Sequence, residues 1–175
     1  MSDSFDLRRT LAAMASALIG FGLLMSAPCG AVASGLTNEL VGTWRLVQYF
    51  DTDASGKVTY PFGEKPIGYL VYDLTGHMSA QLMRTPATPR FASGDDEKGT
   101  EAEVRAAYDG FVAYFGTYRV DEAKSVVTHV VEGSLRPSYV GTDQRRPFKL
   151  QGDILIIQDL QADGTAYFRE FRRVK

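Results

Sequence analysis

The fold is decided by residues 67–84, which read IGYLVYDLTGHMSAQLMR. Residues 67–74 are rich in the β-branched and aromatic side chains that favour strands. Thr75-Gly76 supplies a turn, and in residues 77–84 apolar and polar side chains alternate with the period of an extended chain. One face of this second strand would carry Met78, Ala80 and Leu82. The segment therefore predicts an antiparallel hairpin with one apolar face.

The same pattern continues on both sides of this hairpin. Short polar turns such as residues 51–56, Gly152-Asp153 and Asp163-Gly164 separate further runs of strand-forming residues. The expected strands are residues 41–50, 57–60, 67–74, 77–84, 117–120, 125–135, 142–150, 154–158 and 165–172. So many short antiparallel strands favour an all-β domain, either an up-and-down barrel or a sandwich.

One stretch in the middle of the chain breaks the strand pattern. Residues 85–99 form a long loop, of a kind that often covers a functional site. A helix follows, because Thr100 can cap it and Glu103 completes a capping box. The residues at helical spacing are Val104, Tyr108, Phe111 and Phe115. We expect this apolar stripe to pack on the core at one end of the domain, and the helix and loop to form a lid if the domain holds a cavity.

The N-terminus has the three parts of a secretory signal peptide. Arg8-Arg9 is positively charged, residues 11–25 form an uncharged apolar run of 15 residues, and Ala31-Val32-Ala33 offers a cleavage site before Ser34. The sequence thus predicts a cleaved signal over residues 1–33 and a domain over residues 34–175. The protein would be exported, either to a periplasm or outside the cell.

The signal segment leaves open whether it is cleaved and by which route the protein would be exported. A retained membrane anchor is the alternative to cleavage, although a span needs about 20 apolar residues. The arginine pair allows either the general or the twin-arginine export route. Cleavage would remove Cys29, the only cysteine, and would leave no stable membrane span. The net charge of −2 gives no reason to propose a nucleic-acid surface.

Several segments resemble a known family. Gly42-Thr43-Trp44 resembles the Gly-x-Trp opening of lipocalins, in which a late-strand arginine packs over the tryptophan; Arg173 is the candidate here. The blocks that resemble the bacterial and fungal lipocalin-like domain family are GYLVY (68–72), MSAQL (78–82), YFGTY (114–118), VTH (127–129) and PSYVG (137–141). One departure is Tyr139, where a tryptophan is expected. The resemblance implies a single up-and-down antiparallel barrel of eight or nine strands, with one inserted helix and an internal cavity.

A barrel of this size encloses side chains or one small ligand. The more apolar strand faces should point inward, and the side chains on them are Trp44, Leu46, Met78, Leu82, Tyr118, Val120, Phe148, Leu150, Tyr167 and Phe171. Arg84, Arg146 and Arg169 fall on the same faces. A buried arginine needs a carboxylate or a bound anion, so Arg146 predicts a ligand with an apolar body and an acidic or oxygen-rich end. Alternatively, Arg146 reaches solvent from the end of its strand.

His129 is the other candidate for chemistry. It alternates with Val127 and Val131, and strand parity does not decide which way it points. Beside Tyr114, Tyr118 or Glu132 it could act as a general acid or base on an enol or ketone; alternatively, it is a hydrogen-bonded structural histidine. His77 reads as a solvated turn residue, and two histidines do not define a metal site. We expect no metal and no cofactor, because no phosphate loop or dinucleotide motif is present.

The leading hypothesis is an exported protein that binds a small apolar or amphipathic molecule in a barrel cavity. The expected ligand-binding residues are Tyr72, Met78, Leu82, Arg84, Tyr114, Tyr118, His129, Arg146 and Phe148. The alternative is a cofactor-independent isomerase, cyclase or hydrolyase acting on a hydrophobic secondary-metabolite-like substrate, with His129, Tyr118 and Arg146 as catalytic candidates. A third option is a structural barrel with a filled core. The sequence leaves open the ligand, the presence of catalysis and the oligomeric state.

Overall fold

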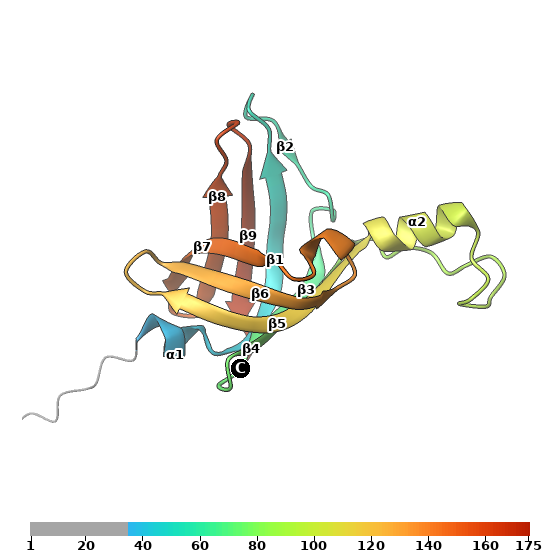
Figure 1. Cartoon of the computed structure of the whole chain (residues 1–175). Helices are drawn as coiled ribbons and strands as arrows, with labels where there is room; N and C mark the ends of the chain where they lie inside the picture. Colours follow the sequence, from blue (N-terminus) through green and yellow to red (C-terminus); the bar gives the residue numbers. More distant parts are fainter. Residues whose placement is uncertain (1–34) are drawn as a thin grey trace, which may run out of the picture. The chain divides into compact units, whose positions relative to one another are not determined.

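The computed structural model describes residues 35–175, so the expected signal segment, residues 1–33, lies outside the described residues. The described part is built almost entirely from antiparallel strands (Figure 1). The strands are β1 (Gly42–Thr52), β2 (Val58–Thr59), β3 (Ile67–Tyr72), β4 (His77–Met83), β5 (Phe111–Asp121), β6 (Val126–Ser134), β7 (Asp143–Gln151), β8 (Ile154–Leu160) and β9 (Ala166–Arg173). The helices are α1 (Leu36–Leu40), α2 (Glu101–Asp109) and the 3-10 helix η1 (Pro137–Tyr139).

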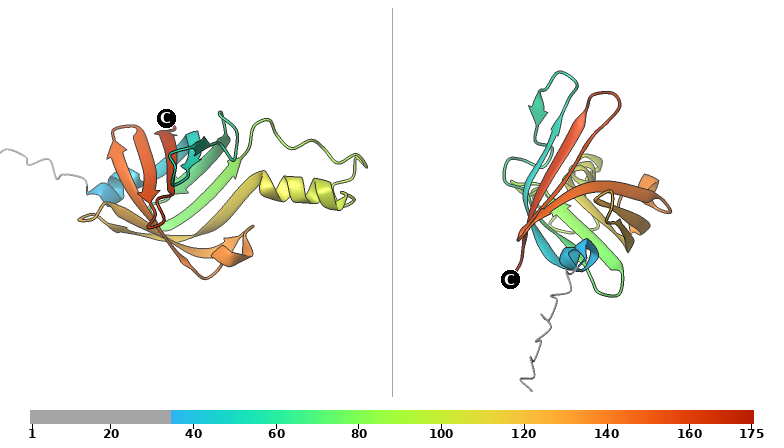
Figure 2. Two further views of the ribbon diagram at one scale, coloured as in Figure 1. Left: turned by 90° about the horizontal axis from the view of Figure 1, so that it is seen from above. Right: turned by 90° about the vertical axis from the view of Figure 1, so that its left-hand side faces the viewer.

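The strands form a closed barrel. Strand order follows the chain from β3 to β9, and β1 pairs with β3 on one side and with β9 on the other. Eight strands therefore close the barrel, and the short β2 adds one further strand at the end of β1. The expected all-β barrel with one helix inserted in mid-chain is confirmed, and the views in Figure 2 show the strands wrapping around a common interior.

A bulge in β1 changes which side chains face that interior. Leu46 pairs with Phe171 and Gln48 with Glu170, so Val47 is an extra residue in the ladder. Because one inserted residue reverses the alternation beyond it, Gln48 is exposed and Tyr49 packs against the core. Strict alternation along residues 42–50 would place Gln48 and Phe50 on the face of Trp44, and the bulge overrides it beyond Leu46.

Trp44 anchors the end of the barrel next to α1. Its side chain is fully buried, and its indole N–H donates to the Leu40 carbonyl over 2.8 Å. The Arg173 guanidinium lies 4.1 Å from the Trp44 ring centre and donates to the Val41 carbonyl over 2.7 Å and to the Glu39 carbonyl. The expected packing of Arg173 over Trp44 is confirmed.

The glycine of the Gly-x-Trp motif makes room for this arginine. Gly42 has a φ of +138°, and a Cβ at that position would lie 2.7 Å from Arg173 Nη1. Glycine tolerates both the conformation and the close approach. Gly42, Trp44 and Arg173 therefore act as one unit that joins the first and last strands.

The helix α2 begins as predicted but ends early. Thr100 and Glu103 form the capping box, whereas the helix stops at Asp109 and Phe111 and Phe115 belong to β5. None of the α2 residues is buried, and Phe115 is 56% exposed on the outer face of the barrel. The expectation of one apolar helical stripe packed on the core was wrong, because its spacing ran across a helix–strand boundary. Figure 1 shows α2 and the preceding loop extending away from the strands rather than across the barrel.

We expect Arg173→Met to lower the free energy of unfolding by about 2–4 kcal/mol, because it removes two charge-assisted hydrogen bonds and the contact with the Trp44 ring. Arg172→Met is the matched control, since Arg172 is exposed on the same strand and should change stability by about 0.5 kcal/mol or less. Urea denaturation of both variants measures the difference. Equal effects would contradict the role given to Arg173.

Candidate ligand-binding cavity

The barrel encloses a cavity of about 500 Å³, a volume within the usual range for small-molecule sites. Every barrel strand contributes to its wall, together with η1 and the segment that follows β2. The apolar lining residues are Pro61, Phe62, Leu70, Ala80, Leu82, Val112, Ile157 and Phe171. The tyrosines and polar residues are Tyr49, Asp51, Asp109, Tyr114, His129, Arg136, Tyr139, Gln144, Arg146, Tyr167 and Arg169.

His129 points inward from β6 and is only 1% exposed. Its Nε2 lies 2.7 Å from the Tyr72 hydroxyl and its Nδ1 lies 3.0 Å from the Tyr114 hydroxyl. Burial, assisted by the positive charge of Arg146, lowers the pKa of His129 to about 3. The imidazole is therefore neutral near pH 7, and each of its nitrogens has a tyrosine hydroxyl as a hydrogen-bond partner.

Arg146 enters the same cavity from the adjacent strand β7. Its guanidinium donates to Gln144 Oε1 over 3.2 Å and to the Arg145 carbonyl over 3.1 Å, and it lies 5.8 Å from the Tyr167 ring centre. None of the ion pairs formed by the described residues includes Arg146. A guanidinium has five N–H donors, so several remain for another acceptor.

Arg169, another arginine in this wall, has protein partners instead. It lies 2.7 Å from an Asp51 carboxylate oxygen and 3.3 Å from the Tyr49 ring centre, and it donates to the Phe50 carbonyl over 2.6 Å. These contacts balance its charge within the wall. Arg146 is thus a cavity arginine whose charge is not matched by any ion pair of the described part of the chain.

Two tyrosine hydroxyls accompany Arg146. Burial raises the pKa of Tyr114 to about 12 and also raises the pKa of Tyr167, although the charge of Arg146 opposes both shifts. Both side chains are therefore neutral phenols near pH 7. The Tyr167 hydroxyl is buried and makes no close hydrogen bond within residues 35–175, and Arg146 is its polar neighbour. An unsatisfied buried hydroxyl is costly unless something in the cavity pairs with it.

The structure brings together some of the expected site residues and separates others. Leu82, Tyr114, His129 and Arg146 line the cavity. Tyr72 contacts His129 but does not line the cavity. Met78 and Phe148 are buried in the core and do not line it either.

Two expected site residues lie elsewhere. Arg84 follows the end of β4, and its backbone N–H donates to the Gly110 carbonyl. Tyr118 stands toward the opposite end of β5, where its hydroxyl donates to the Asp73 carbonyl over 2.9 Å. Of the three catalytic candidates, His129 and Arg146 therefore share the cavity and Tyr118 does not line it.

The contributors to the cavity wall that the sequence analysis missed include Tyr49, Gln144 and Tyr139. Tyr49 turns inward only because of the β1 bulge. Gln144 is paired with His129 across β6 and β7, which nothing in the sequence indicates. Tyr139 comes from η1 and its ring packs edge-on against Tyr114 with centroids 5.9 Å apart. Tyr167 could have been predicted as a cavity residue, because it shares strand parity with Arg169 and Phe171.

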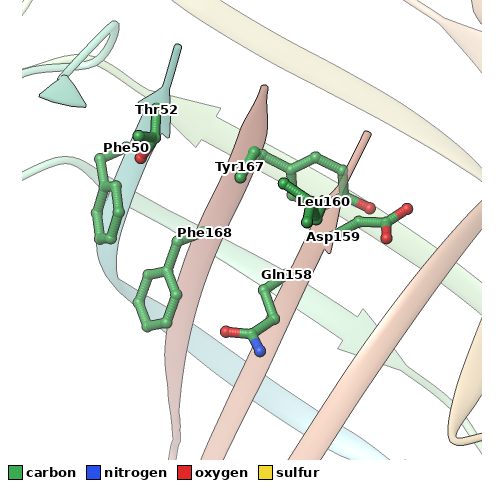
Figure 3. Close-up of a pocket in the computed structure, with 8 residues that line it drawn as sticks. Phe50, Thr52, Gln158, Asp159, Leu160, Tyr167 and Phe168 are labelled. Atoms are coloured by element: carbon green, nitrogen blue, oxygen red, sulfur yellow. The ribbon is translucent and has the colours of Figure 1, made fainter. Parts of the chain in front are cut away.

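A second hollow, of about 440 Å³, lies on the outer side of β1, β8 and β9 (Figure 3). Phe50 stacks on Phe168 there, with centroids 4.8 Å apart. Thr52, Gln158 and Leu160 also line it. This hollow is more open than the internal cavity, and its charged side chain, Asp159, already accepts a hydrogen bond from Gln161 over 3.2 Å, so the candidate site is the internal cavity.

In residues 35–175, no group of three or more potential metal ligands among His, Cys, Asp and Glu side chains comes together. Within the same residues, no helix is long and apolar enough to cross a membrane.

The fold and the cavity define a small β-barrel of the lipocalin kind. The lipocalin-like domain family matches residues 41–172, and the chain belongs to this family.

The chain is similar to a curated relative and to solved β-barrel structures. The 4'-hydroxy-3'-methoxypropiophenone carrier protein ppsC of Aspergillus oryzae is 38% identical over 84 residues, which are 45% of this chain and 75% of the relative. A redesigned β-barrel has a TM-score of 0.40 and 11% identity, covering 79% of this chain and 95% of that one. A variant of the fluorescent protein UnaG has a TM-score of 0.35 and 14% identity, covering 78% and 96%.

The buried neutral His129 predicts a pH-dependent stability. Its pKa in the folded state, about 3, is lower than the value of about 6.5 in an unfolded chain. The unfolded state therefore takes up a proton below about pH 6.5 that the folded state does not accept. The free energy of unfolding consequently decreases as the pH is lowered. From pH 8 to pH 5 we expect His129 to account for a loss of about 2 kcal/mol.

Urea denaturation at pH 8, 6.5 and 5 measures this loss in the wild type and in His129→Gln, which should lack it. His77→Gln is the control, because His77 is exposed, and it should keep the dependence of the wild type. Parallel pH dependences for the wild type and His129→Gln would contradict the assignment.

Proposed function

We propose that this protein is a carrier that holds a small amphipathic organic molecule inside its barrel, with the oxygen-bearing end of the molecule at Arg146. The observation that carries this proposal is a charged arginine in a largely aromatic and aliphatic cavity, with no carboxylate paired to it among the described residues. A ligand oxygen would complete the hydrogen bonding of the guanidinium, and the apolar walls would cover the rest of the ligand.

The similarity to the Aspergillus oryzae protein supports the same chemical class. That relative is named as the carrier of a hydroxylated and methoxylated aryl ketone. Such a molecule combines a flat apolar ring with oxygen atoms at both ends, which suits a cavity whose polar groups are largely tyrosines and arginines. A hydroxyaryl ketone is therefore the first ligand to test.

The observations support a carrier more strongly than an enzyme. The enzymatic alternative draws support from His129 and Arg146, which line one cavity. However, a general base should have a pKa near the working pH, and His129 is far below it. Both of its nitrogens are also engaged by tyrosines, so the proposal gives His129 a structural role.

Ligand titration of the full chain tests the carrier function. We expect 4'-hydroxy-3'-methoxypropiophenone to bind the wild type, and Arg146→Met to weaken binding about 10- to 100-fold through loss of a charge-assisted hydrogen bond. Arg145→Met is the matched control, since Arg145 is exposed on the same strand, and its affinity should match the wild type. Failure of the wild type to bind any of a panel of hydroxyaryl ketones and aromatic carboxylates would contradict the proposal.

Export is a separate part of the proposal. It is supported by the charged, apolar and small-residue segments of residues 1–33. We expect N-terminal sequencing of the protein from its native cells to begin at Ser34. Recovery of the chain with residues 1–33 attached would argue for a retained anchor or for a protein that is not exported.

A further inference from the structure

The hydrogen bonds around His129 have a direction, and that direction determines what the cavity presents to a ligand. Tyr72, His129 and Tyr114 form a chain in which each tyrosine hydroxyl meets one nitrogen of a neutral imidazole. A neutral imidazole has one N–H donor and one acceptor nitrogen. Two arrangements are therefore possible, and they leave different hydroxyl hydrogens unused.

Tyr72 distinguishes the two arrangements. It is 1% exposed, and its hydroxyl has His129 Nε2 as its one hydrogen-bond partner within the described part of the chain. If Nε2 carried the proton, the buried Tyr72 hydrogen would have no acceptor. If Tyr72 instead donates to Nε2, the hydrogen left over is that of Tyr114, which lines the cavity and can meet an acceptor there. The cost of an unsatisfied buried donor favours the second arrangement by roughly 5- to 150-fold.

The favoured arrangement fixes the remaining protons. With Nε2 accepting from Tyr72, the imidazole proton is on Nδ1 and is donated to the Tyr114 oxygen 3.0 Å away. Tyr114 lines the cavity. Its neighbour Arg146 is a guanidinium, which has no acceptor atom for the Tyr114 hydrogen. The Tyr114 hydrogen is therefore directed into the cavity.

Building on the proposed function, we infer that Tyr114 and Arg146 together form a two-donor receptor for an acceptor oxygen of the ligand, the carbonyl of an aryl ketone or the oxygen of an aromatic carboxylate. Tyr72 and His129 are positioning residues, because they set the direction of the Tyr114 hydroxyl without donating to the ligand. Tyr72 does not line the cavity, and its hydroxyl contacts His129, so the hydroxyl acts on the ligand through His129.

Nitrogen-15 NMR of the full chain tests the direction itself. We expect Nε2 of His129 to resonate as an unprotonated imidazole nitrogen and Nδ1 as a protonated one, with the signals of His77 assigned from His77→Gln. Tyr72→Phe should raise the population of the Nε2-protonated tautomer, whereas Tyr69→Phe should not, because Tyr69 is exposed on the same strand. A wild-type His129 protonated at Nε2 would overturn the inference.

A matched pair of ligands tests the receptor. 4'-Hydroxypropiophenone and 4-propylphenol differ only in the carbonyl, so the ratio of their affinities reports on its recognition. We expect Tyr114→Phe to reduce this ratio about 3- to 10-fold, Tyr72→Phe to reduce it by part of that amount, and Tyr69→Phe to leave it unchanged. 4-Hydroxybenzoate, titrated in parallel, shows whether a carboxylate uses the same two donors.

The outcomes separate this inference from the function on which it rests. If both ligands bind and Tyr114→Phe leaves the ratio unchanged, the receptor is wrong and the carrier function stands. If neither ligand nor 4-hydroxybenzoate binds the wild type, the receptor and the proposed carrier function both fail. The NMR experiment still reports the direction of the hydrogen bonds in that case, since it needs no ligand.

Discussion

The pairing of β1 with β9 converts a sheet with two faces into a barrel with one shared interior. Once the sheet is closed, every side chain of inward parity lies in the same enclosed space, and any polar group among them must find its partner there. The unit formed by Gly42, Trp44 and Arg173 holds this closure at one end. The arrangement of charges and hydroxyls in the cavity follows from this constraint.

The barrel meets that constraint in two ways. Arg173 and Arg169 are matched by carbonyls, aromatic rings and carboxylates, so they belong to the wall. His129 is satisfied by two tyrosines. Arg146 and the Tyr167 hydroxyl differ, because the described residues offer them fewer partners than they can use. The difference between satisfied and unsatisfied groups distinguishes the proposed ligand-contacting surface from the rest of the interior.

Much of the fold could be predicted from the sequence because its strands have regular alternation and its turns have glycine or Asx residues. The hairpin of β3 and β4 is the clearest case. Prediction failed where local pattern was ambiguous or was interrupted. The bulge at Val47 placed Tyr49 on the opposite face from the one that strict alternation predicts. The apolar residues from Val104 to Phe115 have helical spacing, although α2 ends at Asp109 and β5 begins at Phe111. For the site, Arg146 could be placed inward from its parity with Phe148. His129 could not, because β6 carries buried valines on both faces, Val126 and Val127; only the sheet register brings Tyr72 and Tyr114 to its two nitrogens.

The central claim is that the interior of the barrel, and not its outer hollow at Phe50 and Phe168, holds an amphipathic ligand by its oxygen atoms. The most direct measurement is a crystal structure of the full chain with a bromine-substituted hydroxyaryl ketone, located by anomalous scattering. The account predicts one bromine site inside the barrel and a ligand oxygen within hydrogen-bonding distance of Arg146 and Tyr114. Bromine density confined to the outer hollow, or a ligand inside the barrel with its oxygens turned away from Arg146, would contradict it.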